Sequence, residues 1–141
     1  MEQRNFSDTI GYHYIVEASG CNPEILSDSN KIRDIFIEAA KLAKMDVRSS
    51  YFFRFYPFGV SGVVIISESH ISTHTWPEKG YAALDVYTCG NTDPEVAVKY
   101  ILEKFEAKHA HFTEIKRGIF EEEDNTYTHM FVTWDEKITK E

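Results

Sequence analysis

The side chains best suited to chemistry gather in residues 67–78, which have the sequence SESHISTHTWPE. This segment holds three Ser, two Thr, two His and two Glu around one Ile and one Trp, directly after the apolar run 62–66. Hydroxyls can attack a carbonyl carbon, and imidazoles accept and donate protons near neutral pH. A buried-looking strand that ends in so many such groups is unusual, so this segment is the first candidate for a reactive site.

His70 and His74 are four residues apart, a spacing that forms a metal-binding pair on a helix. Pro77 and the β-branched residues between the two histidines favour an extended chain instead. In a strand the two would lie about 13 Å apart at ~3.3 Å per residue, too far to share one ion. His109 and His111 have no nearby Cys, and we interpret them as exposed polar residues at a helix end. We therefore expect no metal.

Five further residues have ordinary interpretations when each is taken alone. Cys89 follows a predicted strand and would be a small buried hydrophobe, and Ser61 would be a loop serine. Phe55 and Trp76 would be core aromatics, and Glu78 would be a solvated turn residue. The chain contains no Gly-x-Ser-x-Gly elbow, phosphate loop or dinucleotide-binding fingerprint. Composition and periodicity alone leave a soluble domain of helices and strands with unknown activity.

Hydrophobic periodicity predicts the elements that would position these residues. Amphipathic patterns predict helices over 30–44 and 94–105, and Ser27 and Ser29 are candidate N-caps of the first. Strands are predicted over residues 10–19, 48–56, 60–67, 81–88 and 111–117, with 127–134 as a further strand or an ordered tail. The order β-α-β-β-β-α-β with short turns indicates an α+β fold, in which an antiparallel sheet carries two helices on one face as a two-layer sandwich.

Whole-chain composition limits the function classes. With 141 residues, 43% apolar and 27% charged, the chain is most simply one domain, residues 1–141. The net charge of −8 argues against a general role on nucleic acids or membrane surfaces, because phosphates repel an acidic protein. Cys21 and Cys89 are too few for a disulfide framework, and neither a signal peptide nor a long apolar run is evident, so we expect a cytoplasmic protein. Six Tyr and Phe between residues 51 and 58 suggest that the second sheet face is covered, for instance by another copy of the chain.

Three segments taken together change this interpretation. Residues 59–70 (GVSGVVIISESH), 74–78 (HTWPE) and 80–90 (GYAALDVYTCG) closely resemble the small prokaryotic S-adenosylmethionine decarboxylases, the pyruvoyl-dependent enzymes of polyamine synthesis. The resemblance is dense over residues 54–90 and weaker but continuous over roughly 11–117. It joins five separated polar sites in order and spacing, which makes it highly specific for the family.

The resemblance implies that the chain makes its own cofactor by cleaving itself between Glu68 and Ser69. The Ser69 hydroxyl would attack the Glu68 carbonyl, and Ser61 would donate a hydrogen bond to the resulting oxyanion. His74 would then remove the Ser69 Cα proton so that the ester is eliminated. Residues 1–68 would become a β chain, and residues 69–141 an α chain that begins with a pyruvoyl group derived from Ser69.

The resemblance also implies how the cleaved chain would act on its substrate. The pyruvoyl carbonyl would form a Schiff base with the substrate amine and accept electrons as carbon dioxide leaves. Cys89 would reprotonate the product, decarboxylated S-adenosylmethionine, which is the aminopropyl donor for spermidine. Phe55 and Trp76 would stack on adenine and face the sulfonium charge, and Glu78 would accept hydrogen bonds from the ribose hydroxyls. The site would lie between two protomers, so the working unit would be a homodimer of cleaved chains.

Three departures from the family pattern lie near the expected substrate pocket. Phe53 stands where His is common, the turn 56–58 is unusually aromatic, and Thr73 stands where an apolar residue is common. They leave open arginine or ornithine as substrates, because the pyruvoyl chemistry needs only an α-amine and a carboxylate. The retained substrate residues named above favour S-adenosylmethionine. A regulatory homologue that does not cleave is a further alternative, opposed by the presence of all the reactive residues.

Overall fold

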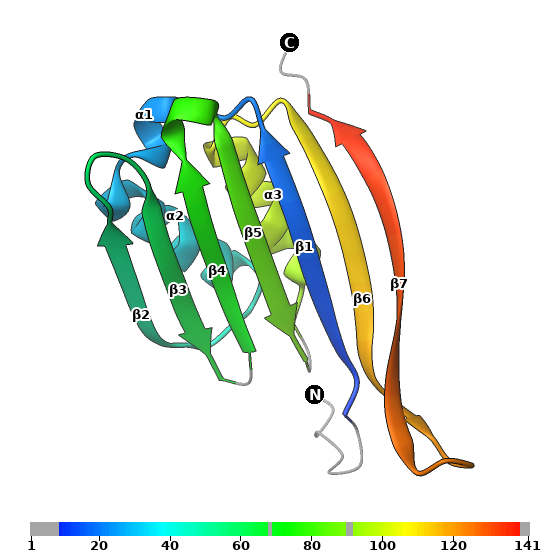
Figure 1. Ribbon diagram of the computed structural model, residues 1–141. Coiled ribbons are helices and arrows are strands. Elements are labelled where there is room, and N and C mark those ends of the chain that lie inside the picture. Colours follow the sequence, from blue (N-terminus) through cyan, green and yellow to red (C-terminus); the bar gives the residue numbers. More distant parts are fainter. Residues whose placement is uncertain (1–8, 68, 90–91, 139–141) are drawn as a thin grey trace.

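The computed structural model describes residues 9–67, 69–89 and 92–138, which form one antiparallel sheet backed by helices (Figure 1). Within these residues the sheet has seven strands in the order β2-β3-β4-β5-β1-β6-β7, and every neighbouring pair is antiparallel. The strands are β1 (Gly11–Ser19), β2 (Val47–Arg54), β3 (Val60–Ile66), β4 (Ser69–Trp76), β5 (Tyr81–Thr88), β6 (His109–Glu121) and β7 (Thr126–Lys137). The predicted antiparallel sheet with accompanying helices is confirmed.

The helical elements are α1 (Pro23–Leu26), α2 (Ser29–Leu42), the 3₁₀ turn η1 (Pro77–Lys79) and α3 (Pro94–Lys104). In α2 the apolar residues recur every three or four positions, which produces one buried stripe along the helix. Its N-cap is Asp28, whose carboxylate accepts a hydrogen bond from the Lys31 N–H at 3.0 Å, so the prediction of Ser27 or Ser29 is wrong. None of the helices in the described residues is long and apolar enough to cross a bilayer.

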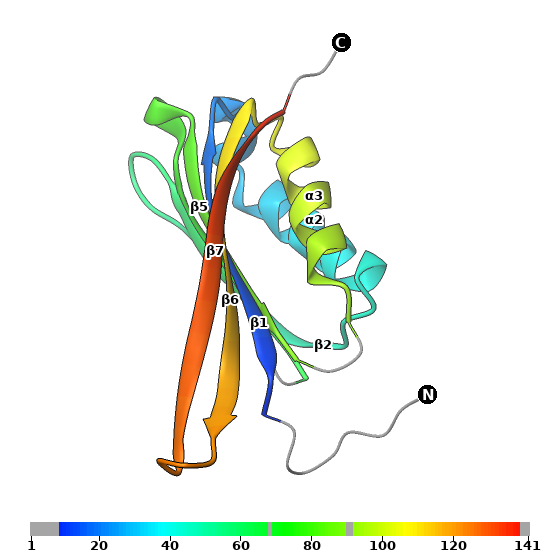
Figure 2. The same cartoon turned by 90° about the vertical axis from the view of Figure 1, so that its right-hand side faces the viewer.

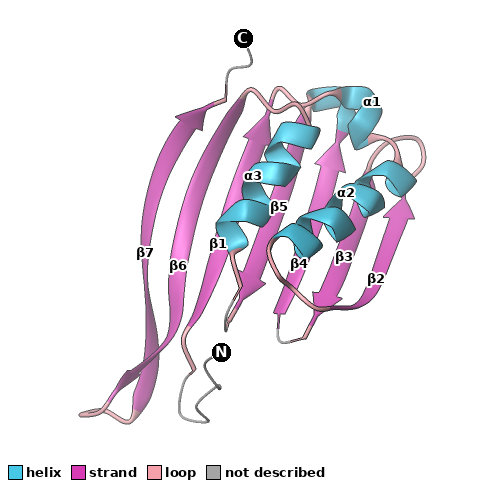
Figure 3. Ribbon diagram, turned by 180° about the vertical axis from the view of Figure 1, so that it is seen from behind, coloured by secondary structure: helices cyan, strands magenta, loops and turns pink. Residues whose placement is uncertain are grey.

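Helices α2 and α3 lie side by side against one face of the sheet, as Figures 2 and 3 show from the edge and from behind. The alternation in β5 follows from this arrangement. Four of its residues are buried toward the helices, namely Ala82, Leu84, Val86 and Thr88. The other four are half-buried on the opposite side, namely Tyr81, Ala83, Asp85 and Tyr87. We call the side of the sheet that carries these last four residues the open face; it faces the viewer in Figure 1.

The predicted element order is wrong because it omits strand β4, and of the two alternatives for residues 127–134 the structure has the strand, β7. Segment 69–76 is a full central strand between β3 and β5. Two of its core-facing residues are threonines, which weakens the apolar alternation in the sequence. Both hydroxyls are hydrogen-bonded: Thr75 Oγ1 donates to the Leu26 carbonyl and Thr73 Oγ1 donates to the Ala83 carbonyl, each at 2.8 Å. Among the described strands, β7 pairs only with β6 and is exposed along most of its length. Apolar and polar residues therefore need not alternate along it.

Phe36 on α2 is central to the core, which leads to a stability prediction. Its ring is fully buried and contacts the rings of Phe52 and Phe105 at centroid distances of 5.8 and 6.0 Å. We expect Phe36→Ala to lower the free energy of unfolding by about 3–5 kcal/mol, because it removes apolar contacts and leaves a cavity. Urea unfolding would measure this loss, with the exposed Leu42→Ala on the same helix as a control expected within about 0.5 kcal/mol of the parent. Equal losses in both variants would contradict the prediction.

Candidate active site

Ser61 and His74 form one reactive pair on the open face. They are cross-strand partners in the register of β3 and β4, and Ser61 Oγ lies 2.7 Å from His74 Nδ1. The next strand places the small Ala83 opposite His74, which leaves the imidazole exposed. The pair therefore combines a hydroxyl and an imidazole in direct hydrogen-bond contact, as acid–base chemistry requires. We call Ser61 and His74 the His74 half-site.

Ser69 and Cys89 form a second pair at the other end of β4. Ser69 is the first residue of that strand, and Cys89 directly follows the end of β5. The Cys89 N–H donates a hydrogen bond to Ser69 Oγ at 3.2 Å, and the Cys89 sulfur lies 3.9 Å from the same oxygen. A backbone donor and a thiol thus hold the serine oxygen in one place. We call Ser69 and Cys89 the Ser69 half-site; Glu68, the other predicted cleavage residue, lies outside the described residues.

The two half-sites of one chain are far apart. Ser69 and His74 belong to the same extended strand, and five residues of strand span about 17 Å at ~3.3 Å per residue. A base must come within about 3 Å of the proton that it removes. His74 therefore cannot reach the Ser69 Cα proton of its own chain while β4 is intact.

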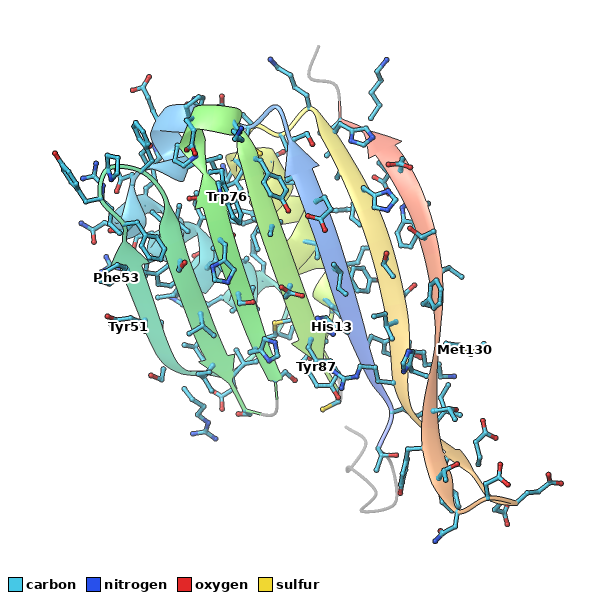
Figure 4. The ribbon with its side chains drawn as sticks, in the orientation of Figure 1. His13, Tyr51, Phe53, Trp76, Tyr87 and Met130 are labelled. Atoms are coloured by element: carbon cyan, nitrogen blue, oxygen red, sulfur yellow. The ribbon has the colours of Figure 1, made fainter. Side chains whose placement is uncertain are left out.

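The predicted substrate-binding residues gather at the His74 end of the sheet. Trp76, labelled in Figure 4, ends β4 on the same side as His74. Its indole stacks on the ring of Tyr81 at a centroid distance of 5.0 Å. Phe55 follows β2 and packs edge-to-face against Phe53 at 5.1 Å, while Glu78 is exposed in η1. Aromatic rings and a carboxylate are thus available at one rim of the open face.

Of the three departures from the family pattern, Thr73 does not lie in this region. Its side chain is fully buried on the helix side of β4 rather than on the open face. The threonine is tolerated in the core because its hydroxyl is hydrogen-bonded, as described above. Phe53, by contrast, does lie on the exposed surface beside Phe55. The expectation that all three departures border the substrate is therefore wrong for Thr73.

A cluster next to the Ser69 half-site was missed from the sequence. His13 Nε2 lies 3.0 Å from Asp85 Oδ1, and the rings of His13 and His70 meet edge-to-face at 6.2 Å. Tyr87, which lies beside His13 in Figure 4, contacts both histidines. The Arg117 guanidinium lies 4.7 Å above the Tyr87 ring. Burial lowers the pKa of His70, and the charges of His13 and Arg117 lower it further, against an opposing effect of Asp85. His70 is therefore mainly neutral at pH 7. Period-two alternation places these residues on one face of each strand, but it cannot show which strands are neighbours.

His109, His111 and the second cysteine lie elsewhere. His109 and His111 are in strand β6 rather than at a helix end, and both imidazoles contact Asp135 Oδ1 on β7, at 3.2 and 2.9 Å. Within the part of the chain that the structure describes, no group of three or more His, Cys, Asp or Glu side chains is arranged to hold a metal ion. Cys21 is buried, which raises the pKa of its thiol to about 12. It therefore stays protonated and is poorly suited to reaction.

A family model and several curated proteins that are similar to this chain all name the same enzyme. The family model described as "S-adenosylmethionine decarboxylase" matches residues 12–118. A protein of Pyrococcus furiosus named "S-adenosylmethionine decarboxylase proenzyme" is 69% identical over 134 residues, which is 94% of this chain and 96% of that protein. A protein of Acetivibrio thermocellus with the same name is 51% identical over 116 residues, covering 82% of this chain and 94% of that protein.

A solved structure agrees with these sequence matches. The crystal structure of the adenosylmethionine decarboxylase from Aquifex aeolicus VF5 superposes with a TM-score of 0.75 at 37% identity, covering 84% of this chain and 99% of that one. The chain belongs to the S-adenosylmethionine decarboxylase family. Both half-sites lie within the matched residues 12–118, whereas strand β7 lies beyond them.

Proposed function

We propose that the chain is a self-processing, pyruvoyl-dependent carboxy-lyase that removes carbon dioxide from S-adenosylmethionine. Its product, decarboxylated S-adenosylmethionine, serves as the aminopropyl donor for spermidine synthesis. Family membership and the word "proenzyme" in the names of the relatives support a precursor that matures. The observation that carries the proposal is the Ser69 half-site, in which the Cys89 N–H holds Ser69 Oγ at 3.2 Å beside the thiol. A cytoplasmic location stays a prediction from the sequence.

Self-processing would begin at the peptide bond between Glu68 and Ser69. Ser69 Oγ attacks the Glu68 carbonyl carbon, the C–N bond breaks, and the amide becomes an ester with a free Ser69 amine. Ser61 donates a hydrogen bond to the oxyanion of the intermediate. His74 then removes the Ser69 Cα proton, and the Glu68 carboxylate leaves from Cβ. The dehydroalanine that remains takes up water and loses ammonia, which yields a pyruvoyl group at residue 69.

The surroundings of Ser69 fit such a group. The Cys89 N–H donates a hydrogen bond to the serine oxygen, and a carbonyl oxygen in place of the hydroxyl could accept the same hydrogen bond. When present, the pyruvoyl group supplies an electron sink for the bond that breaks as carbon dioxide departs. The role of Cys89 is to deliver a proton from its thiol to the substrate carbon, since the sulfur lies 3.9 Å from Ser69 Oγ.

Both processing and catalysis would take place between two copies of the chain. Because the half-sites of one chain are about 17 Å apart, a twofold arrangement of two open faces is needed to bring the partner's His74 to Ser69. The open face and its rim carry large exposed apolar side chains, among them Tyr51 (66% exposed), Phe53 (46%) and Ile65 (42%), which a second copy would cover. The working unit is then a homodimer of cleaved chains.

Substrate recognition would use the aromatic rim of the open face. Trp76 and Phe55 are exposed flat rings that can stack on adenine and attract the sulfonium charge. Glu78, exposed in η1, can accept hydrogen bonds from the ribose hydroxyls. None of these three groups would be required by arginine or ornithine, and their presence supports S-adenosylmethionine.

Intact mass under denaturing conditions tests the proposal. The purified protein is expected to give two fragments that match residues 1–68 and 69–141, the second lighter by one ammonia than the simple hydrolysis product. The control Ser69→Ala is expected to remain one chain of about the parental 16.3 kDa. Carbon dioxide release is then compared for S-adenosylmethionine, arginine and ornithine. A parent chain that stays uncleaved contradicts self-processing, and release from arginine or ornithine alone contradicts the substrate.

A further inference from the structure

Trp76, Tyr81 and Glu17 form a continuous series of contacts across three neighbouring strands of the open face, β4, β5 and β1. The Trp76 indole stacks on the Tyr81 ring with an interplanar angle of 24° and a centroid distance of 5.0 Å. The Tyr81 hydroxyl donates a hydrogen bond to Glu17 Oε1. An exposed aromatic residue at the rim of the sheet is thereby tied to a strand two positions away.

This arrangement restricts how the indole can lie. Trp76 remains 39% exposed, and a tryptophan at the end of a strand has several staggered rotamers available to it. Tyr81 occupies one face of the indole, so only the opposite face can receive a ligand. The Tyr81 ring cannot swing away easily because its hydroxyl is held by Glu17. The contacts thus select one orientation of the Trp76 plane.

The hydrogen bond from Tyr81 to Glu17 persists over the whole physiological pH range. Burial raises the pKa of Tyr81 to about 12, together with the hydrogen bond to Glu17 and the negative charge of that carboxylate, with a smaller effect of Asp85. The phenol is therefore a hydrogen-bond donor at any physiological pH. Hydrogen bonds from a phenol to a carboxylate are stronger than those between neutral groups. Neither the Trp76–Tyr81 stacking nor the Tyr81–Glu17 hydrogen bond requires a bound ligand, so the indole is oriented before binding.

We infer that Tyr81 and Glu17 are positioning residues. They fix the Trp76 indole so that its free face can stack on the adenine ring of a ligand. The inference rests on the proposed function, because Trp76 is assigned there to the adenine of the substrate. Tyr81 itself does not stack on the ligand; it acts through Trp76. Its loss is therefore expected to weaken ligand binding while leaving self-cleavage and turnover in place, a pattern that general destabilisation would not produce.

Single-tryptophan proteins allow a direct test. The chain has two tryptophans, Trp76 and Trp134. Trp134 lies on the edge strand β7, where it stacks on Phe112. The substitution Trp134→Phe therefore leaves Trp76 as the only indole. In this background, Tyr81→Leu removes the stack, Tyr81→Phe removes only the hydroxyl, and Glu17→Gln keeps a hydrogen-bond acceptor. Tyr100→Leu, at a half-buried tyrosine on α3, controls for general loss of packing.

Three readouts are taken for each variant: the time-resolved anisotropy of Trp76, the quenching of Trp76 by adenosine, and kcat and KM for S-adenosylmethionine. Tyr81→Leu is expected to free the indole and to raise both the adenosine Kd and KM on the order of threefold to tenfold, with kcat changed less than about twofold. Tyr81→Phe should show a smaller effect, and Glu17→Gln should stay close to the background protein.

Three results would overturn the inference. The first is an indole in Tyr81→Leu that is as immobile as in the background protein. The second is a free indole in that variant with an unchanged adenosine Kd. The third is an equal loss of adenosine binding in Tyr100→Leu. A background protein that binds adenosine through Trp76 but releases no carbon dioxide from S-adenosylmethionine contradicts the proposed function and leaves the positioning role supported.

Discussion

Co-expression of Ser69→Ala and His74→Ala chains is expected to restore cleavage that neither variant shows alone. In a mixed dimer of the proposed kind, the intact Ser69 of the His74→Ala chain would meet the intact His74 of the Ser69→Ala chain, because each proposed site takes one half-site from each copy. The second site of the same dimer lacks both groups. With random pairing, roughly a quarter of all chains should be cleaved, and all of them should carry the His74→Ala substitution. Intact mass distinguishes the two chains.

The double variant Ser69→Ala/His74→Ala co-expressed with the parent is the matched control. Mixed dimers of that pair contain no complete site, so cleavage should come only from dimers of the parent. Absence of cleavage in the first mixture, with both variants folded and able to dimerise, would show that His74 acts within its own chain. That result would require β4 to open, since the strand as it stands keeps the two residues about 17 Å apart.

Cys89→Ala is expected to separate self-processing from decarboxylation. The variant keeps the backbone N–H that holds Ser69 Oγ at 3.2 Å, so the serine stays oriented and the chain should still cleave. It loses the thiol that we propose as the proton donor, and loss of a positioned general acid typically lowers the rate by about 10²–10⁴-fold. Mass spectrometry would measure the cleaved fraction, and carbon dioxide release from S-adenosylmethionine would measure kcat.

Cys21→Ala is the control for this experiment because that thiol is buried away from Ser69 and remains protonated. It should leave both cleavage and decarboxylation near the parental values. If Cys89→Ala decarboxylates as fast as Cys21→Ala, another group supplies the proton. The cluster of His13, Asp85 and His70 beside the Ser69 half-site would then contain the next candidates for the proton donor.

Much of the local structure could be predicted from the sequence. The hairpin of β2 and β3 follows from two β-rich runs separated by a Pro and Gly turn, and helices α2 and α3 follow from amphipathic spacing. Candidate reactive residues could also be named, because the motif that contains Ser61, Ser69, His74 and Cys89 is continuous enough in sequence to be recognised. These features depend on neighbours along the chain, and such neighbours are visible in a sequence.

Which residues meet was decided only by the tertiary structure. Ser61 and His74 are 13 residues apart in sequence, Ser69 and Cys89 are 20 apart, and His13 and Asp85 are 72 apart. Periodicity reports which side of a strand is buried, but it carries no information about the partner strand or the register. The same holds for the distance between the two half-sites, which follows from β4 being a continuous central strand. The chemical groups and their local elements could thus be read from the chain itself, whereas the long-range pairing of strands sets the Ser61–His74 and Ser69–Cys89 pairs at opposite ends of β4.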